Sequence, residues 1–179
     1  MGPQMTKMLA LDKYARDPKP WRIHAQYNLD AARVLFTNEA SITLCFPAAT
    51  LGHLALEGLL KTALIREGFT IFDPAKLKQL VNNSLARDEC AWGHNLVALA
   101  RLLASKRTDF NLCKPINGAF PPHEYPVTIE NGLEIFDPFF SELRYPQQLN
   151  RLQGIGPDDG RMLDAIVEEL LPFAGPLVR

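Results

Sequence analysis

The stretch HLALEGLLK, residues 53–61, carries a histidine, a glutamate and a lysine inside a run of leucines and small residues. His53, Glu57 and Lys61 recur every four residues, so a helix places them in one polar line along its length. Nearly all of the remaining surface of that helix is apolar. A helix that is apolar on almost every side is expected at the centre of a fold, surrounded by other helices.

Apolar residues repeat every three or four positions in three further segments, which predicts amphipathic helices that pack around the central one. The four predicted principal helices run from Trp21 to about 38, from about 40 to Glu67, from about 94 to 105, and from about 157 to Leu171. Gly68 is expected to end the second helix as its C′ residue, and Pro172 is expected to stop the last one. Four such stripes favour burial in one bundle.

The segments between these helices predict smaller features. Asp73-Pro74 favours a short helix that ends near Val81, and residues 106–126 form a long proline-rich loop. Asn131-Gly132, flanked by alternating apolar residues, is typical of a β-hairpin turn. We therefore expect an all-α protein, an up-and-down antiparallel four-helix bundle with one extra short helix and a small β-hairpin in a long loop insertion. Residues 1–20 are expected to be an N-terminal arm and residues 21–179 a single domain.

The composition narrows the range of partners and compartments. The chain has 19 Lys and Arg against 20 Asp and Glu, so no overall charge attracts it to DNA or to an anionic membrane. Three cysteines that are far apart in sequence give no disulfide framework and no metal-ligand spacing, which favours the reducing cytoplasm. No signal peptide and no apolar run of roughly 20 residues is present. These features predict a cytoplasmic, soluble protein.

Three segments in a fixed order resemble the HEPN domain family. The first is ATLGHLALEGLLKTALIREG, an apolar helix with Glu57 four residues before Lys61. The second is WGHNLVALARLL, which opens a helix with His94, and the third is SELRYP, which contains Arg144 and Tyr145. The resemblance spans about residues 25–172, and residues 70–90 and the proline-rich loop look like insertions into the compact family core.

The resemblance implies an antiparallel helical bundle, which is frequently a homodimer in this family. Some members of the family are RNA-cleaving toxins or defence proteins, marked by an arginine, four to six residues and then a histidine late in the bundle. Others lack this motif and act as binding modules, often beside a small nucleotidyltransferase. In this chain no histidine follows Arg144, so the expected place for the motif is empty. The pair Arg87 and His94 has a similar spacing and is the alternative catalytic pair.

The candidate ligand-binding residues are His53, Glu57, Lys61, Arg144 and Tyr145. We expect Glu57 to lie within salt-bridge or water-bridged distance of Arg144, in a polar groove near a dimer interface. Each residue also has a structural interpretation. The line from His53 to Lys61 then forms a partly solvated seam with an ordinary i, i+4 ion pair. In the same interpretation, Arg144 fixes the chain where it leaves the bundle, by binding carboxylates or free carbonyl groups.

His94 has a structural interpretation as well, as a helix cap or a residue that hydrogen-bonds a loop. The leading functional hypothesis is a non-catalytic HEPN-like module that binds a nucleotide, RNA or a nucleotidyltransferase partner. One alternative is a metal-independent endoribonuclease that uses Arg87 and His94, and another is a purely structural subunit. No cofactor and no metal is expected, because the chain has no Gly-rich phosphate loop, no His-x3-His pair and no close cysteine pair.

Overall fold

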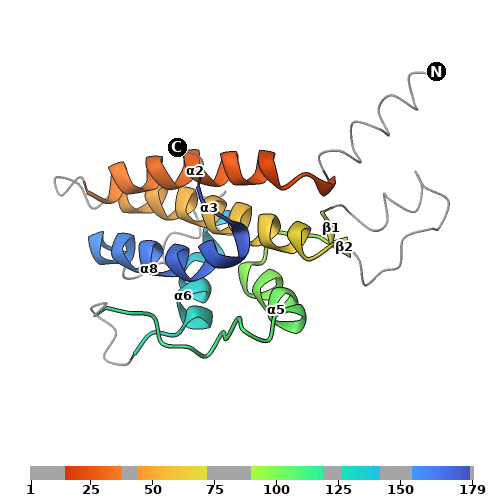
Figure 1. Ribbon diagram of the computed structural model, residues 1–179. Coiled ribbons are helices and arrows are strands. Elements are labelled where there is room, and N and C mark those ends of the chain that lie inside the picture. The colour runs from red at the N-terminus through yellow and green to blue at the C-terminus, as the bar shows by residue number, and fades with distance from the viewer. Residues whose placement is uncertain (1–14, 38–43, 72–89, 119–125, 142–154, 178–179) are drawn as a thin grey trace, which may run out of the picture.

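A computed structural model describes residues 15–37, 44–71, 90–118, 126–141 and 155–177 of the 179-residue chain. These residues are mainly helical, which confirms the all-α class (Figure 1). The elements are α2 (Pro18–Phe36), α3 (Cys45–Arg66), β1 (Thr70–Ile71), β2 (Cys90–Ala91), α5 (Leu96–Lys106), α6 (Ile129–Phe136), α7 (Pro138–Ser141) and α8 (Pro157–Ala174).

The expected central position of α3 is confirmed. Its contacts extend to α2, α5, α6, α7 and α8, and its residues are buried around the whole circumference over most of its length. The apolar stripes predicted for the other three principal helices face this helix or one another, and their members belong to one core. The buried stripe residues are Leu29, Ala32 and Phe36 of α2, Leu96, Leu99 and Leu103 of α5, and Leu163, Ile166, Val167 and Leu170 of α8.

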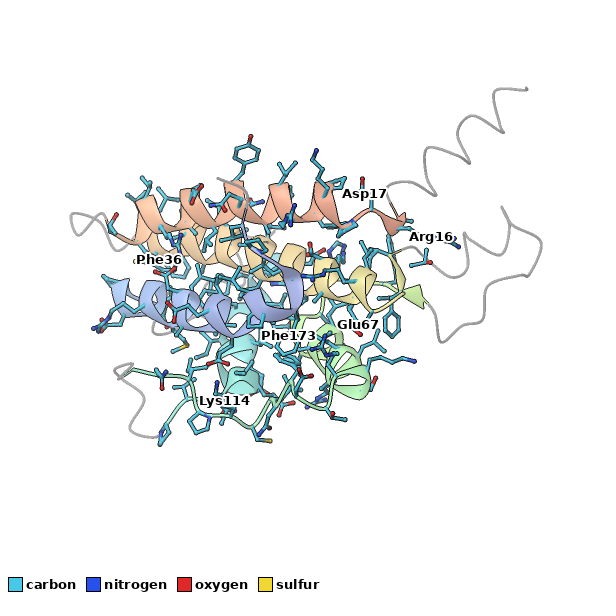
Figure 2. All side chains as sticks on the ribbon, viewed as in Figure 1. Arg16, Asp17, Phe36, Glu67, Lys114 and Phe173 are labelled. Carbon is cyan, nitrogen blue, oxygen red and sulfur yellow. The ribbon has the colours of Figure 1, made fainter. Side chains whose placement is uncertain are left out.

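The contacts at the helix ends give the directions of the principal helices. Gly160, near the start of α8, lies against Phe36 at the end of α2, whereas Gly175, just after α8, lies against Arg66 at the end of α3. Therefore α8 runs antiparallel to α2 and parallel to α3. Figure 2 labels Phe36 at one end of this layer, with Phe173 and Glu67 nearer the other.

The third helix departs from a strict alternation of direction. His94, just before α5, is hydrogen-bonded to Glu57, and Arg107, just after α5, is hydrogen-bonded to Glu67. Hence α5 runs along α3 in the same direction, whereas in an up-and-down bundle these two successive principal helices would run in opposite directions.

A close approach of α2 and α3 is made by Gly58. A Cβ atom at this position would lie 2.9 Å from the Cβ of Ala25 and 2.9 Å from the carbonyl oxygen of Trp21. Only a residue without a side chain allows the two backbones to come this near. This contact also fixes Trp21 beside the polar line of α3.

The starts of the first two helices differ from the expected positions. The first helix begins at Pro18 rather than at Trp21, and Asp17 caps it by accepting a hydrogen bond from the backbone N–H of Lys19. Proline is tolerated in a first helical turn because the N–H that it lacks would have no partner there. For the same reason Pro47 fits into the first turn of α3, which begins at Cys45 rather than near residue 40. Gly68 follows α3 with a φ of 90°, as expected for a C′ glycine.

The predicted β-hairpin at residues 127–135 is wrong, because this segment forms the helix α6. The hydroxyl group of Thr128 caps the helix by accepting a hydrogen bond from the backbone N–H of Asn131. The alternation of apolar residues also matches a helix, since Ile129, Leu133 and Phe136 lie four and three positions apart and are all buried. The N-cap and the packing of this helix therefore outweighed the turn preference of Asn131-Gly132.

The last helix does not stop at Leu171, because α8 continues through Pro172 to Ala174. The proline loses one intrahelical hydrogen bond close to the end of the helix, while burial of Phe173 and Ala174 favours continuation. Gly175, with a φ of 86°, ends the helix instead.

Two short contacts bring the segment before α5 to the middle of α3. A parallel strand pair that the sequence pattern did not predict joins β1 to β2, with Thr70 opposite Cys90 and Ile71 opposite Ala91. At the other end of this segment, the carboxylate of Asp137 accepts hydrogen bonds from the backbone N–H of Leu96 and from the side-chain amide of Asn95. The residues between these two contacts are thereby held over α3.

Within the described residues, α3 is the one helix that is long and apolar enough to cross a membrane by length and composition. However, 83% of its apolar window is buried inside the fold, as in the core helix of a globular domain. Because the core helix of a globular domain can have the same length and composition, α3 is weak evidence that the chain crosses a membrane.

Candidate functional site

The polar line of α3 is buried rather than solvated. His53, Glu57 and Lys61 are 0%, 4% and 2% exposed, respectively. The interpretation of this line as a partly solvated seam is therefore wrong. Water is excluded because the segment before α5 and the start of α2 cover this side of α3. Charged groups at this depth require partners, because an uncompensated charge in a protein interior is costly.

Lys61 carries the buried positive charge of this cluster. Its ammonium group donates a hydrogen bond to Oε1 of Glu57. Its Nζ atom also lies 4.5 Å from the centre of the Trp21 ring and 5.9 Å from the centre of the Trp92 ring. Aromatic faces attract cations through their quadrupole, so the two indoles replace part of the lost hydration of the ammonium group.

His53 connects the carboxylate of Glu57 to the end of α6. Its Nδ1 atom lies 3.0 Å from the carbonyl oxygen of Phe136, which can only accept, so Nδ1 carries the hydrogen. Its Nε2 atom lies 3.5 Å from Oε2 of Glu57. The ring is thus fixed between a backbone carbonyl and a carboxylate.

His94 connects the buried carboxylate of Glu57 to the protein surface. Its Nδ1 atom lies 3.1 Å and 3.0 Å from the two carboxylate oxygens of Glu57, and its side chain is 48% exposed. The N-cap of α5 is Asn95, whose side chain accepts a hydrogen bond from the backbone N–H of Ala98. His94 therefore does not cap the helix and is available to orient toward Glu57.

Glu57 is the centre of the cluster because three side chains converge on its carboxylate. Burial alone would raise its pKa, because it disfavours the charged form. The contact with His53, the positive charge of Lys61 and the hydrogen bonds from Lys61 and His94 act in the opposite direction and lower its pKa to about 2. The carboxylate is therefore ionised at neutral pH.

This arrangement has two chemical consequences. A buried, ionised carboxylate that binds one ring nitrogen of a half-exposed histidine fixes the orientation of its imidazole ring. The same carboxylate neutralises a buried lysine. Among the residues that the structure describes, no group of three His, Cys, Asp or Glu side chains is arranged to hold a metal ion.

The structure brings together four of the residues singled out from the sequence, namely His53, Glu57, Lys61 and His94. Arg87, Arg144 and Tyr145 lie outside the described residues, as does the short helix expected from Asp73 to Val81. The expected proximity of Glu57 and Arg144 therefore stays a prediction.

Two members of the cluster were not predicted as site residues. The rings of Trp21 and Trp92 flank Lys61, and Trp92 is 52% exposed. The one signal for Trp92 in the sequence is its position two residues before His94, next to a predicted helix start. Nothing in the helical periodicity connects Trp21 to Lys61.

Comparisons with known proteins assign no family to this chain. No protein-family model matches the sequence, and neither a curated protein nor a solved structure matches it. The resemblance to the HEPN domain family is therefore a prediction from the ordered motifs alone.

Proposed function

We propose that this protein is a non-catalytic, HEPN-like module that binds RNA or a nucleotide on the surface formed by Trp92 and His94. The observation that carries the proposal is the pairing of a half-exposed indole with a half-exposed histidine that is held by a buried carboxylate. An exposed aromatic ring can stack on any base, and an imidazole whose Nδ1 donates to a carboxylate can accept a hydrogen bond from a base edge at Nε2, or donate one to a phosphate when both ring nitrogens are protonated. A nucleotidyltransferase partner and a homodimer remain parts of this hypothesis.

The fold class supports this proposal at a coarse level. We propose that α2, α3, α5 and α8 are the four principal helices of a HEPN-like bundle, and the central position of α3 supports it. The antiparallel contact between α2 and α3 fits the expected up-and-down order, whereas the direction of α5 does not. Arg144 and Tyr145 are proposed to complete the binding surface, and the protein is proposed to act in the cytoplasm.

Binding is tested with a fluorescently labelled, single-stranded RNA of mixed sequence, whose anisotropy is measured as the protein is added. Loss of one stacked base costs about 1–3 kcal/mol, so Trp92→Ala is expected to weaken binding by about fivefold to 150-fold. Tyr27→Ala is the matched control, because Tyr27 is the most exposed aromatic side chain of α2 and lies outside the cluster. Equal affinities of the wild-type protein and Trp92→Ala would contradict the proposal.

The second candidate is a metal-independent endoribonuclease, and one observation favours it. Glu57 binds a ring nitrogen of His94 in the way that a carboxylate orients a general-base histidine. The test is incubation of the purified protein with mixed RNA in the presence of a chelator. Cleavage that is lost in His94→Ala would favour the enzyme, whereas binding without cleavage would favour the module.

The third candidate is a purely structural subunit whose apolar helices require another protein. Size-exclusion chromatography with light scattering distinguishes it from the leading proposal. A stable homodimer that binds RNA would argue against this candidate.

A further inference from the structure

Two arginines meet at the end of the molecule where α2, α3 and α8 come together. Arg22 is on α2 and Arg66 is the last residue of α3. Gly175 follows α8 with a φ of 86°, and on the side where it lacks a Cβ its neighbours are the Nη1 atoms of Arg66 and Arg22. A Cβ atom at position 175 would lie 2.7 Å from Nη1 of Arg66 and 3.6 Å from Nη1 of Arg22, so both guanidinium groups approach the same face of Gly175.

Neither guanidinium group is neutralised by the part of the chain that the structure describes. No carboxylate of these residues lies within ion-pair distance of Arg22 or Arg66. The Nε atom of Arg22 is in addition buried and has no hydrogen-bond partner there. Buried donors in native proteins are nearly always bonded, so an unbonded one requires an explanation.

The carboxylates near this end of the molecule bind other groups. Arg107 donates hydrogen bonds to Glu67 at 2.9 Å and to Asp109 at 2.7 Å, and the hydrogen bond to Asp109 lowers the pKa of that carboxyl group. The carboxylate of Asp17 accepts the backbone N–H of Lys19. Each of these three carboxylates therefore already accepts a hydrogen bond from a group other than Arg22 or Arg66.

The C-terminal end of α8 explains why cations gather here but does not balance their charge. The last carbonyl groups of a helix carry a partial charge equivalent to roughly −0.5 of an elementary charge. Two guanidinium groups carry two full positive charges. Among the described residues, the dipole of α8 therefore does not balance the charge of Arg22 and Arg66.

We propose that Arg22 and Arg66 form a binding site for a phosphate group, a site separate from the surface around Trp92 and His94. A planar carboxylate is matched by a single guanidinium fork. Two guanidinium groups that approach one space from different helices instead match a tetrahedral dianion, which offers oxygens in several directions. Arg22 is half-buried and Arg66 is exposed, so Arg66 is the guanidinium group that a phosphate reaches first from the solvent.

The proposal is tested by calorimetric titration of the full chain with inorganic phosphate, pyrophosphate, adenosine monophosphate and acetate at constant ionic strength. Saturable binding of a phosphate-containing probe is expected, with acetate weaker by about tenfold or more. The preferred probe distinguishes a free phosphate from a phosphate that belongs to a nucleotide. Arg66→Gln is expected to weaken binding by about tenfold, whereas Arg161→Gln, an exposed arginine of α8 paired with Asp158, leaves it unchanged.

Thermal unfolding separates this role from a purely structural one. If Arg66 only stabilises the end of α8, Arg66→Gln lowers the melting temperature equally with and without phosphate. If the site binds phosphate, Arg66→Gln leaves the melting temperature of the free protein unchanged or raises it, because two like charges are separated, and the rise caused by phosphate disappears. The proposal is overturned if the wild-type protein binds none of the three phosphate probes, if Arg66→Gln binds them equally well, or if the structural pattern is observed. Loss of RNA binding in Trp92→Ala does not affect this test.

Discussion

The Nδ1 atom of His94 lies 3.0 Å from Oε2 of Glu57, so a half-exposed imidazole shares a carboxylate with a fully buried ammonium group. This relationship joins the protein surface to the centre of α3. A ligand that changes the charge or the position of His94 acts directly on the partner of Lys61. Binding at the surface is therefore expected to change the stability of the core.

Glu57→Gln is expected to destabilise the protein strongly. The substitution leaves Lys61 buried without its counter-charge, and breaking a buried ion pair from one side costs about 3–5 kcal/mol. The free energy of unfolding, measured with urea at pH 7, gives the cost. Glu169→Gln is the matched control, because Glu169 binds Lys114 at the surface, where such a pair contributes about 0–1 kcal/mol. Equal losses in the two variants would contradict a buried, energetically important cluster.

The stability of the protein is expected to fall in acid through Glu57. Its pKa is depressed to about 2 in the folded protein, against about 4.3 in an unfolded chain. The unfolded state therefore binds the proton first, and the stabilisation is complete above about pH 4.3 and is lost as the pH falls further. Urea unfolding of wild-type protein and Glu57→Gln at several pH values measures this component. The difference between the two should shrink from pH 5 downward, and a constant difference would refute the depressed pKa.

The pair of Glu57 and Lys61 is expected to show strong coupling in a double-mutant cycle. Lys61→Met leaves the carboxylate buried without its ammonium partner, as Glu57→Leu leaves the ammonium group without its carboxylate. The double variant removes both charges, so it is expected to be more stable than the sum of the two single losses predicts, by about 1–3 kcal/mol. Additive losses in urea unfolding would show that the two charges are not coupled in the folded protein.

Gly58→Ala is expected to separate α2 from α3. The new methyl group would lie 2.9 Å from both the Cβ of Ala25 and the carbonyl oxygen of Trp21, and the latter belongs to backbone that cannot rotate away. Overpacking of this kind costs about 1–3 kcal/mol. Gly156→Ala is the control, because a Cβ there meets nothing within 4 Å. Its cost, measured in the same thermal unfolding experiment, should be clearly smaller.

Thr128→Ala tests the helix that replaces the expected hairpin. The hydroxyl group of Thr128 accepts the backbone N–H of Asn131 at 3.2 Å, and loss of such an N-cap costs about 1 kcal/mol. Ser105→Ala is the control, because the exposed hydroxyl of Ser105 only donates to a carbonyl of its own last turn. If the two variants unfold at the same urea concentration, Thr128 does not cap α6.

Helical periodicity was sufficient to predict the interior of the fold. The stripes of the four principal helices depend on spacings of three and four residues, and these spacings are set by burial. Local turn chemistry was a weaker guide, because Asn131-Gly132 occurs inside a capped and buried helix and Pro172 occurs inside the last turns of another. In both segments tertiary packing outweighed the local preference.

The candidate site could be predicted only along α3. His53, Glu57 and Lys61 share one face because of their spacing, and that relation is visible in the sequence. Their burial and their contact with His94 are not, because these depend on how the segment before α5 crosses α3. No local pattern encodes a contact between residues that are 37 positions apart.

The two indole rings that flank Lys61 have a practical consequence, because the chain has two tryptophans and both are in this cluster. The tryptophan emission of the protein therefore originates within a few ångströms of one ammonium group. Any event that moves that charge, whether a bound molecule, a proton or the start of unfolding, changes the spectrum without a label.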